Sequence, residues 1–236
     1  MCTDGYKRKL IERGVPAEKI EVIYNWCDEE HIRTVEKDSK VAEEFGMAGK
    51  FNIVFAGNIG KAQSLSAVLD AARLVREDCP DVQFLFFGGG IEVDQLREKA
   101  HREQLRNVVF FERQPLAKIS SILSLADVLL VHLKNDPVYR ITIPSKTQAY
   151  MAIGRPILSA VGEDTNGIVE RAGAGFTCEP EDAEAIAETV RKFRDTPKDE
   201  LSQMGANGRE FYQREMSFSV AVDKYEKLFE AAARKR

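Results

Sequence analysis

The chain has 236 residues, of which 44% are hydrophobic and 31% are charged. These fractions are typical of soluble globular proteins and exclude a disordered or fibrous chain, and the length suits one large domain or one domain with appendages. The formal net charge of −4 lacks the basic excess of proteins that coat nucleic acid, so we expect no nucleic-acid partner.

The composition predicts neither a membrane span nor a metal site. No apolar run approaches the ~18 residues that a spanning helix needs, and the first residues lack the apolar core of a secretion signal. The four cysteines are far apart and form no zinc-binding pattern. Scattered thiols favour a reducing cytoplasm over a disulfide framework, and we expect neither a metal nor a cofactor.

Residues 1–50 do not follow the pattern of the rest of the chain. An amphipathic helix is predicted over residues 5–13 and a strand over residues 20–24. One helix and one strand cannot form a sheet alone. These elements are therefore either the end of a preceding unit or elements that pack on the main domain.

From about residue 50 onward, predicted strands alternate with predicted helices. Short apolar runs predict strands, and apolar residues at helical spacing predict helices. The predicted strands are residues 51–56, 82–87, 108–111, 128–131, 156–160 and 175–178. The predicted helices are residues 65–76, 93–103, 119–125, 145–153 and 166–171, followed by an all-helical tail over 183–194, 198–214 and 218–232.

This alternation predicts both the fold class and the place of a binding site. It is typical of α/β proteins with a Rossmann-like, doubly wound parallel sheet that helices cover on both faces. Right-handed crossovers bring the carboxyl ends of all strands to one edge of the sheet. Ligands bind at this edge, where the strand order reverses, so the residues that follow each strand are the candidates for a site.

The turn after the first of these strands has the composition of a diphosphate site. Gly57 and Gly60 let the backbone approach a ligand closely. Lys61 adds a positive charge, Asn58 and Gln63 add neutral donors, and the following helix start would direct free N–H groups at an anion. The turn lacks both the GxGxxG and the Walker A pattern, and an ordinary turn with a solvated lysine is an equal alternative.

Gly88, Gly89 and Gly90 follow the second strand. Three consecutive glycines cost conformational entropy, which favours a loop held against a ligand or against a neighbouring loop. A tight turn is an equally weighted alternative.

The segment after the fourth strand opens the helix predicted over residues 145–153. Pro144 suits a first helical turn and Ser145 suits a cap. Free N–H groups of residues 145–147, together with the charges of Lys146 and Arg140, would then make an electrostatic phosphate site. The alternative is a capped helix with solvated basic residues.

Other polar residues at the same edge carry weaker signals. The backbone around Arg113, after the third strand, is a candidate to present an N–H and a C=O to a base. His132 ends the fourth strand, where a lone histidine is more often structural than catalytic. Glu163 and Asp164 are within reach of sugar hydroxyls by position, but acidic residues there also favour a helix start electrostatically.

Four segments, taken together, resemble a known family: residues 22–26, 55–63, 87–90 and 143–157 occur in its order. The chain resembles the C-terminal, donor-binding half of retaining GT-B glycosyltransferases of family 4, and it is most similar to the branch that builds bacterial surface polysaccharides. The resemblance covers nearly the whole chain. It implies two Rossmann-like domains, of which the C-terminal one binds most of a nucleotide-sugar.

The resemblance also implies a division of the chain. Residues 1–24 would be a remnant of the N-terminal domain and linker, residues 25–214 the nucleotide-sugar-binding domain, and residues 215–236 a helix that crosses back. The acceptor site and any membrane-docking surface would lie in the missing half. We therefore expect a cytoplasmic protein that the missing half can bring to the inner face of the membrane, and no turnover by this chain alone.

Relatives assign roles to particular positions. Many carry an arginine where this chain has Asn58 and a lysine where it has Gln63, both of which contact the donor diphosphate, and Lys61 is positioned to replace that charge. Two glutamates of relatives stand at Ile141 and Ala149; the first faces the transferred sugar and the second holds the ribose. The donor-binding residues implied here are Gly57, Asn58, Gly60, Lys61, Gln63, Gly88, Gly89, Gly90, Arg113, Arg140, Pro144, Ser145, Lys146, Thr147 and Gln148, with Gln148 as a substitute contact to the ribose.

The implied reaction is transfer of a hexosyl or N-acetylhexosaminyl group, with retention, from a nucleoside diphosphate sugar to a lipid-linked or polysaccharide acceptor. Uridine is the base expected from the branch. Lys61, Lys146 and helix-start amides would stabilise the leaving diphosphate without a metal. Two alternatives stay open: a nucleotide-sugar 2-epimerase, which would need carboxylates in the cleft, and a non-catalytic nucleotide-binding module.

Overall fold

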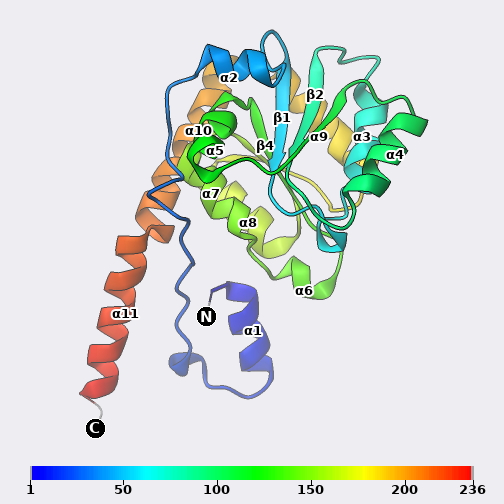
Figure 1. Ribbon diagram of the computed structural model, residues 1–236. Coiled ribbons are helices and arrows are strands. Elements are labelled where there is room, and N and C mark those ends of the chain that lie inside the picture. Colours follow the sequence, from blue (N-terminus) through cyan, green and yellow to red (C-terminus); the bar gives the residue numbers. More distant parts are fainter. Residues whose placement is uncertain (1, 235–236) are drawn as a thin grey trace.

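The computed structural model describes residues 2–234 (Figure 1). Its centre is a sheet of six parallel strands in the order β3-β2-β1-β4-β5-β6, which confirms the predicted Rossmann-like, doubly wound fold. Each of the six strands predicted from residue 50 onward agrees with an observed one to within a residue at either end. The strands are β1 Phe51–Ala56, β2 Val82–Phe87, β3 Val108–Phe111, β4 Val128–His132, β5 Ile157–Ala160 and β6 Gly175–Thr177.

The strand order reverses at β1. Phe55 of β1 pairs with Phe86 of β2 on one side, and Val54 pairs with Leu129 of β4 on the other. The carboxyl ends of these three strands therefore diverge into loops that leave a crevice between them, which is where doubly wound sheets bind ligands.

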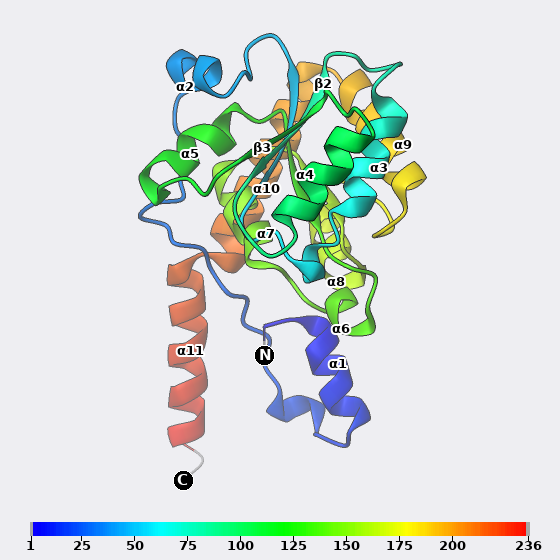
Figure 2. The same cartoon turned by 45° about the vertical axis from the view of Figure 1, so that its right-hand side comes forward.

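Both faces of the sheet are covered, because successive strand residues point to opposite sides. Val54 belongs to one buried cluster, and its neighbours Ile53 and Phe55 belong to the other. The helices that contribute most to the first cluster include α5 Leu116–Leu125, α7 Ser145–Ile153, α8 Glu163–Ala172 and the end of α10 Lys198–Phe211. Those that contribute most to the second include α3 Ser66–Val75, α4 Val93–Arg102 and α9 Ala183–Asp195 (Figures 1 and 2).

The predicted strand over residues 20–24 is wrong. The segment lies between a short 3-10 turn, Ala17–Lys19, and residue 28 without joining the sheet. Ile20 and Ile23 are nevertheless buried. The alternating apolar residues thus serve packing rather than a strand ladder, and sequence periodicity alone does not distinguish the two.

The two ends of the chain carry elements outside the sheet domain. α1 Asp4–Glu12 lies below α6 and α8 in both views, and α11 Phe218–Ala233 extends from the body beyond a π-helical turn at Tyr212–Met216 (Figures 1 and 2). Two short helices were not predicted, α2 Ser39–Glu44 and α6 Pro137–Arg140. Within residues 2–234, every helix is too short or too polar to cross a bilayer.

Candidate functional site

A hollow of about 650 Å³ opens at the carboxyl edge of the sheet, between the loops after β1, β2 and β3 and the start of α7. Three loops that the sequence singled out separately, after β1, β2 and β3, therefore meet at one place with the start of α7. The predicted residues that line it are Gly57, Asn58, Gly88, Gly89, Gly90, Arg113, Ser145 and Lys146.

The glycine loops after β1 and β2 lie backbone against backbone. Gly57 N–H donates to the Phe87 carbonyl at 2.8 Å, and Ile59 N–H donates to the Gly89 carbonyl at 2.9 Å, so the ladder continues past the strands. Gly88 has a φ of +159°, and a Cβ there would lie 1.8 Å from the Gly57 carbonyl oxygen. Gly89 has open space instead. The loop is thus held against its neighbouring loop, one of the two alternatives that the sequence allowed.

Lys146 reaches into the hollow from the first turn of α7. Its Nζ lies 4.7 Å from the centre of the Phe55 ring, and a Cβ on Gly57 would lie 2.8 Å from the same Nζ. Burial lowers the pKa of Lys146 to about 8. Among the described residues that line the hollow, the charged ones are Lys146 and Arg113, and none is a carboxylate. The hollow is therefore electrostatically suited to an anion.

Tyr150 fixes α7 to the end of β1. Its hydroxyl accepts a hydrogen bond from Ala56 N–H at 2.9 Å, and the side chain is 1% exposed. Burial raises the pKa of Tyr150, so it stays protonated. Sequence analysis missed this residue, although its position four residues after Lys146 puts the two on the same face of a helix.

The opposite wall of the hollow is apolar. It consists of Ile32, Leu116, Ile119 and Leu123, three of which come from α5. A site with a glycine-lined, positively charged side and an apolar side suits a ligand that joins an anionic group to a flat, weakly polar one. Sequence analysis missed this wall, because Ile32 precedes the repeating pattern and the α5 residues look like ordinary core positions.

The structure does not bring the other predicted residues into the hollow. They are Gly60, Lys61, Gln63, Arg140, Pro144, Thr147 and Gln148. Lys61 is exposed in a 3-10 turn beside it. The Gln63 Oε1 accepts from Gly60 N–H at 3.1 Å, which shapes the loop from within.

Arg140 and the first turn of α7 also differ from the expectation. Two carboxylates hold the guanidinium of Arg140, Glu179 at 3.0 Å and Glu163 at 3.4 Å, so its charge is already compensated. Thr147 N–H donates to the Pro144 carbonyl at 2.9 Å, so it is not a free helix-start amide. In the amide orientation that satisfies its hydrogen bonds, Gln148 Nε2 lies 2.8 Å from that same carbonyl, and the side chain is 2% exposed. The Gln148 amide therefore bonds the start of its own helix and does not line the hollow, and its contact to a ribose stays a prediction.

His132 has a structural role. Its Nε2 lies 3.1 Å from Glu181 N–H, which can only donate, so Nε2 accepts and Nδ1 carries the proton toward the Gln63 carbonyl at 2.7 Å. Burial lowers the pKa of His132, which is 1% exposed. The neutral ring thereby ties the turn after β1 to the segment before α9.

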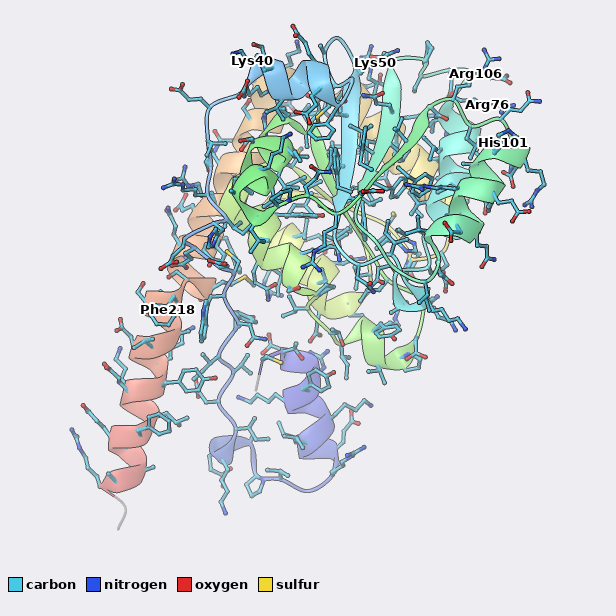
Figure 3. The ribbon with its side chains drawn as sticks, in the orientation of Figure 1. Lys40, Lys50, Arg76, His101, Arg106 and Phe218 are labelled. Carbon is cyan, nitrogen blue, oxygen red and sulfur yellow. The ribbon has the colours of Figure 1, made fainter. Side chains whose placement is uncertain are left out.

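A second group of basic residues lies at the opposite edge of the sheet. Lys40, Lys50, Arg76 and Arg106 are all exposed there (Figure 3). Arg76 donates to the carbonyl of Glu103, the residue that caps the C-terminus of α4. Since helix C-termini carry a partial negative charge, Arg76 complements the end of α4.

Comparisons with known proteins agree with this geometry. The model of the family described as "Glycosyl transferases group 1" matches residues 31–211. WbjE of Pseudomonas aeruginosa, named as a glycosyltransferase, is 29% identical over 86% of this chain and 50% of its own length. WcaI of Escherichia coli (strain K12), named for colanic acid biosynthesis, is 28% identical over 80% of this chain and 47% of its own length. The chain thus spans about half the length of these curated relatives.

Solved structures share the fold. HepE of Anabaena, determined in complex with UDP, superposes with a TM-score of 0.82 at 19% identity, covering 95% of this chain and 61% of that one. The C-terminal domain of the glycosyl transferase group 1 protein LpcC from Francisella tularensis gives a TM-score of 0.66 at 16% identity, covering 81% of this chain and 98% of that domain. Nearly the whole length of that C-terminal domain is therefore matched here.

Proposed function

Because this chain belongs to the family of glycosyl transferases group 1, we propose that it binds the nucleoside diphosphate sugar for retaining transfer of a hexosyl or N-acetylhexosaminyl group. The observation that carries the proposal is the hollow at the carboxyl edge, where the half-buried ammonium of Lys146 faces glycine-lined backbone and the described lining residues include no carboxylate.

Two relatives support the finer parts of the proposal. HepE, which shares the fold, was solved with UDP, and this supports uridine as the base. WcaI is named for colanic acid biosynthesis, and this supports a polysaccharide or lipid-linked acceptor. The chain spans about half of its relatives, so we propose that the acceptor site and turnover belong to a complete two-domain enzyme.

In the proposed complex, the diphosphate lies along the loops of Gly57 and Gly89, because a Cβ at Gly89 would have nothing within 4 Å and the backbone there is open to a ligand. Lys146 and the first amides of α7 supply positive charge to the leaving diphosphate as the bond to the sugar breaks. The base lies toward the apolar wall and the backbone around Arg113. Because these groups are built into the site, we expect donor binding without added divalent metal.

Titration calorimetry of the chain with UDP tests the proposal. We expect Lys146→Gln to weaken UDP binding at least about tenfold, or roughly 1.4 kcal/mol. Lys61 lies outside the hollow, so Lys61→Gln should have a smaller effect, although the sequence alone assigned both lysines to the diphosphate. Lys40→Gln, at the opposite edge of the sheet (Figure 3), is the matched control. Equal UDP affinities for wild type and Lys146→Gln would refute the assignment of this hollow.

Incubation with a UDP-sugar in the absence of an acceptor distinguishes glycosyl transfer from epimerisation. An epimerase would interconvert UDP-sugars without an acceptor, using carboxylates that the described lining of the hollow does not provide. Incubation of the complete enzyme with UDP-sugar alone should therefore leave the sugar configuration unchanged.

A further inference from the structure

The first turn of α1 is held to the body by one buried carboxylate. Gly5 N–H donates to Asp164 Oδ2 at 2.6 Å, and the Arg8 guanidinium donates to Asp164 Oδ1 at 2.8 Å. Asp164 is 8% exposed. Both of its oxygens are thus occupied by a segment about 160 positions away in the sequence.

Asp164 lies between the amino ends of two helices. It stands in the first turn of α8, and the Gly5 amide belongs to the first turn of α1. Both helix starts carry a partial positive charge, and Arg8 adds a full one. A single negative charge therefore satisfies three positive groups, which a neutral side chain of the same shape cannot do.

The close approach depends on the absence of a side chain at residue 5. A Cβ on Gly5 would lie 2.4 Å from Ile141 Cβ and 2.8 Å from Asp164 Oδ2. The backbone of α1 therefore packs directly on Ile141, which belongs to the loop that precedes α7.

The same loop is bonded to both helices. Thr165, next to Asp164 and fully buried, donates its hydroxyl to the Thr142 carbonyl at 2.8 Å. The Thr142 hydroxyl lies 3.4 Å from the Tyr6 hydroxyl of α1. Four residues later the chain reaches Lys146 in the hollow. Contacts thus run without a break from Asp164 to the loop that sets the start of α7.

We infer that Asp164 is a positioning residue that couples α1 to the donor hollow. Its carboxylate holds residues 4–12 against Ile141 and Thr142, and this contact fixes the path of residues 141–147 that ends at Lys146. Loss of the Asp164 charge should make residues 4–12 and residues 141–147 more mobile together. The part of the inference that concerns donor binding rests on the proposed function, and the part that concerns the loop does not.

Hydrogen exchange on the whole chain tests the coupling. Asp164→Asn keeps the shape, but it removes the charge and puts an NH₂ group against either Arg8 or the Gly5 amide. We expect amides in residues 4–12 and 141–147 to exchange at least about tenfold faster, while those of β1 and β4 keep their protection and show that the fold is intact.

The control is Asp182→Asn, which alters a carboxylate at another helix start. Asp182 caps α9 by accepting from Ala185 N–H at 2.9 Å and does not line the hollow. It should leave exchange at residues 141–147 unchanged. Faster exchange confined to residues 4–12 in Asp164→Asn would show that the carboxylate merely anchors α1, and would overturn the inference.

Calorimetry with UDP gives the second readout. If the two regions are coupled, the Asp164→Asn variant should bind UDP at least about fivefold more weakly than wild type, which is the lower end of usual coupling between sites. The UDP affinity of Asp182→Asn should be unchanged. Unchanged UDP affinity in Asp164→Asn would contradict the coupling to the hollow. If wild type fails to bind UDP, the proposed function fails, and the exchange at residues 141–147 still decides the coupling.

Discussion

The ammonium of Lys146 lies 4.7 Å from the centre of the Phe55 ring. Within residues 2–234 no carboxylate comes within ion-pair distance of it, and burial lowers its pKa to about 8. A half-buried cation without a counter-ion destabilises the folded chain. An anionic ligand that binds in the hollow would supply the counter-ion that Lys146 lacks.

The affinity for UDP should depend on pH through Lys146. Because its pKa lies near 8 in the free protein, an increasing fraction of the side chain is neutral above that pH. We expect the dissociation constant to rise by up to about tenfold per pH unit between pH 8 and pH 9. Calorimetry with Lys146→Arg is the comparison, since arginine stays charged; parallel pH profiles for both proteins would contradict the prediction.

Removal of the charge should stabilise the fold. Lys146→Met keeps much of the shape, and we expect the free energy of unfolding to rise by about 1 to 3 kcal/mol at pH 7. The lysine of the unfolded chain binds its proton up to its ordinary pKa of 10.5, whereas the folded one loses it near 8. Wild-type stability therefore increases with pH across that window.

The increase in the free energy of unfolding caused by Lys146→Met should consequently be largest at pH 7 and vanish toward pH 10.5. Urea unfolding at several pH values measures it. A variant that is less stable than wild type at pH 7 would show that the ammonium has a compensating partner.

Gly88 and Gly89 should respond differently to the same substitution. A Cβ at Gly88 would lie 1.8 Å from the Gly57 carbonyl oxygen, whereas Gly89 has nothing within 4 Å. We expect Gly88→Ala to cost about 2 kcal/mol or more and to distort the hollow, because the obstacle is backbone. Gly89→Ala should change stability by less than about 0.5 kcal/mol. Similar unfolding midpoints for the two variants would disprove the tight packing of these loops.

His132 should make stability depend on pH below neutrality. Its folded pKa is lowered by burial, so the unfolded chain binds the proton first as pH falls from about 6.5. The contribution of the neutral His132 ring to the free energy of unfolding is thus present above pH 6.5 and is lost progressively below it. Urea unfolding at pH 7.5 and 5.5 should show a smaller difference for His132→Asn than for wild type, with exposed His101 as the control in His101→Asn. Identical differences in all three proteins would exclude His132 as the cause.

Local sequence patterns are sufficient to predict the layout of the sheet domain. Apolar runs such as Ile53–Phe55 and the intervening helical periodicity are local patterns, and they predict parallel strands whose loops after β1, β2 and β4 share an edge. The same local reasoning failed at residues 20–24, where buried Ile20 and Ile23 pack without a partner strand.

Which basic residue enters the hollow depends on contacts that form only in the folded chain. The sequence offers three similar basic candidates: Lys61, Arg140 and Lys146. In the structure, Lys61 is exposed beside the hollow, and Arg140 is paired with Glu163 and Glu179. Lys146 alone of the three lines the hollow. Those outcomes depend on helix phase, on the path of each loop and on partners distant in sequence, none of which a local pattern contains. For the same reason the contact between Asp164 and Gly5 became visible only once the chain was folded.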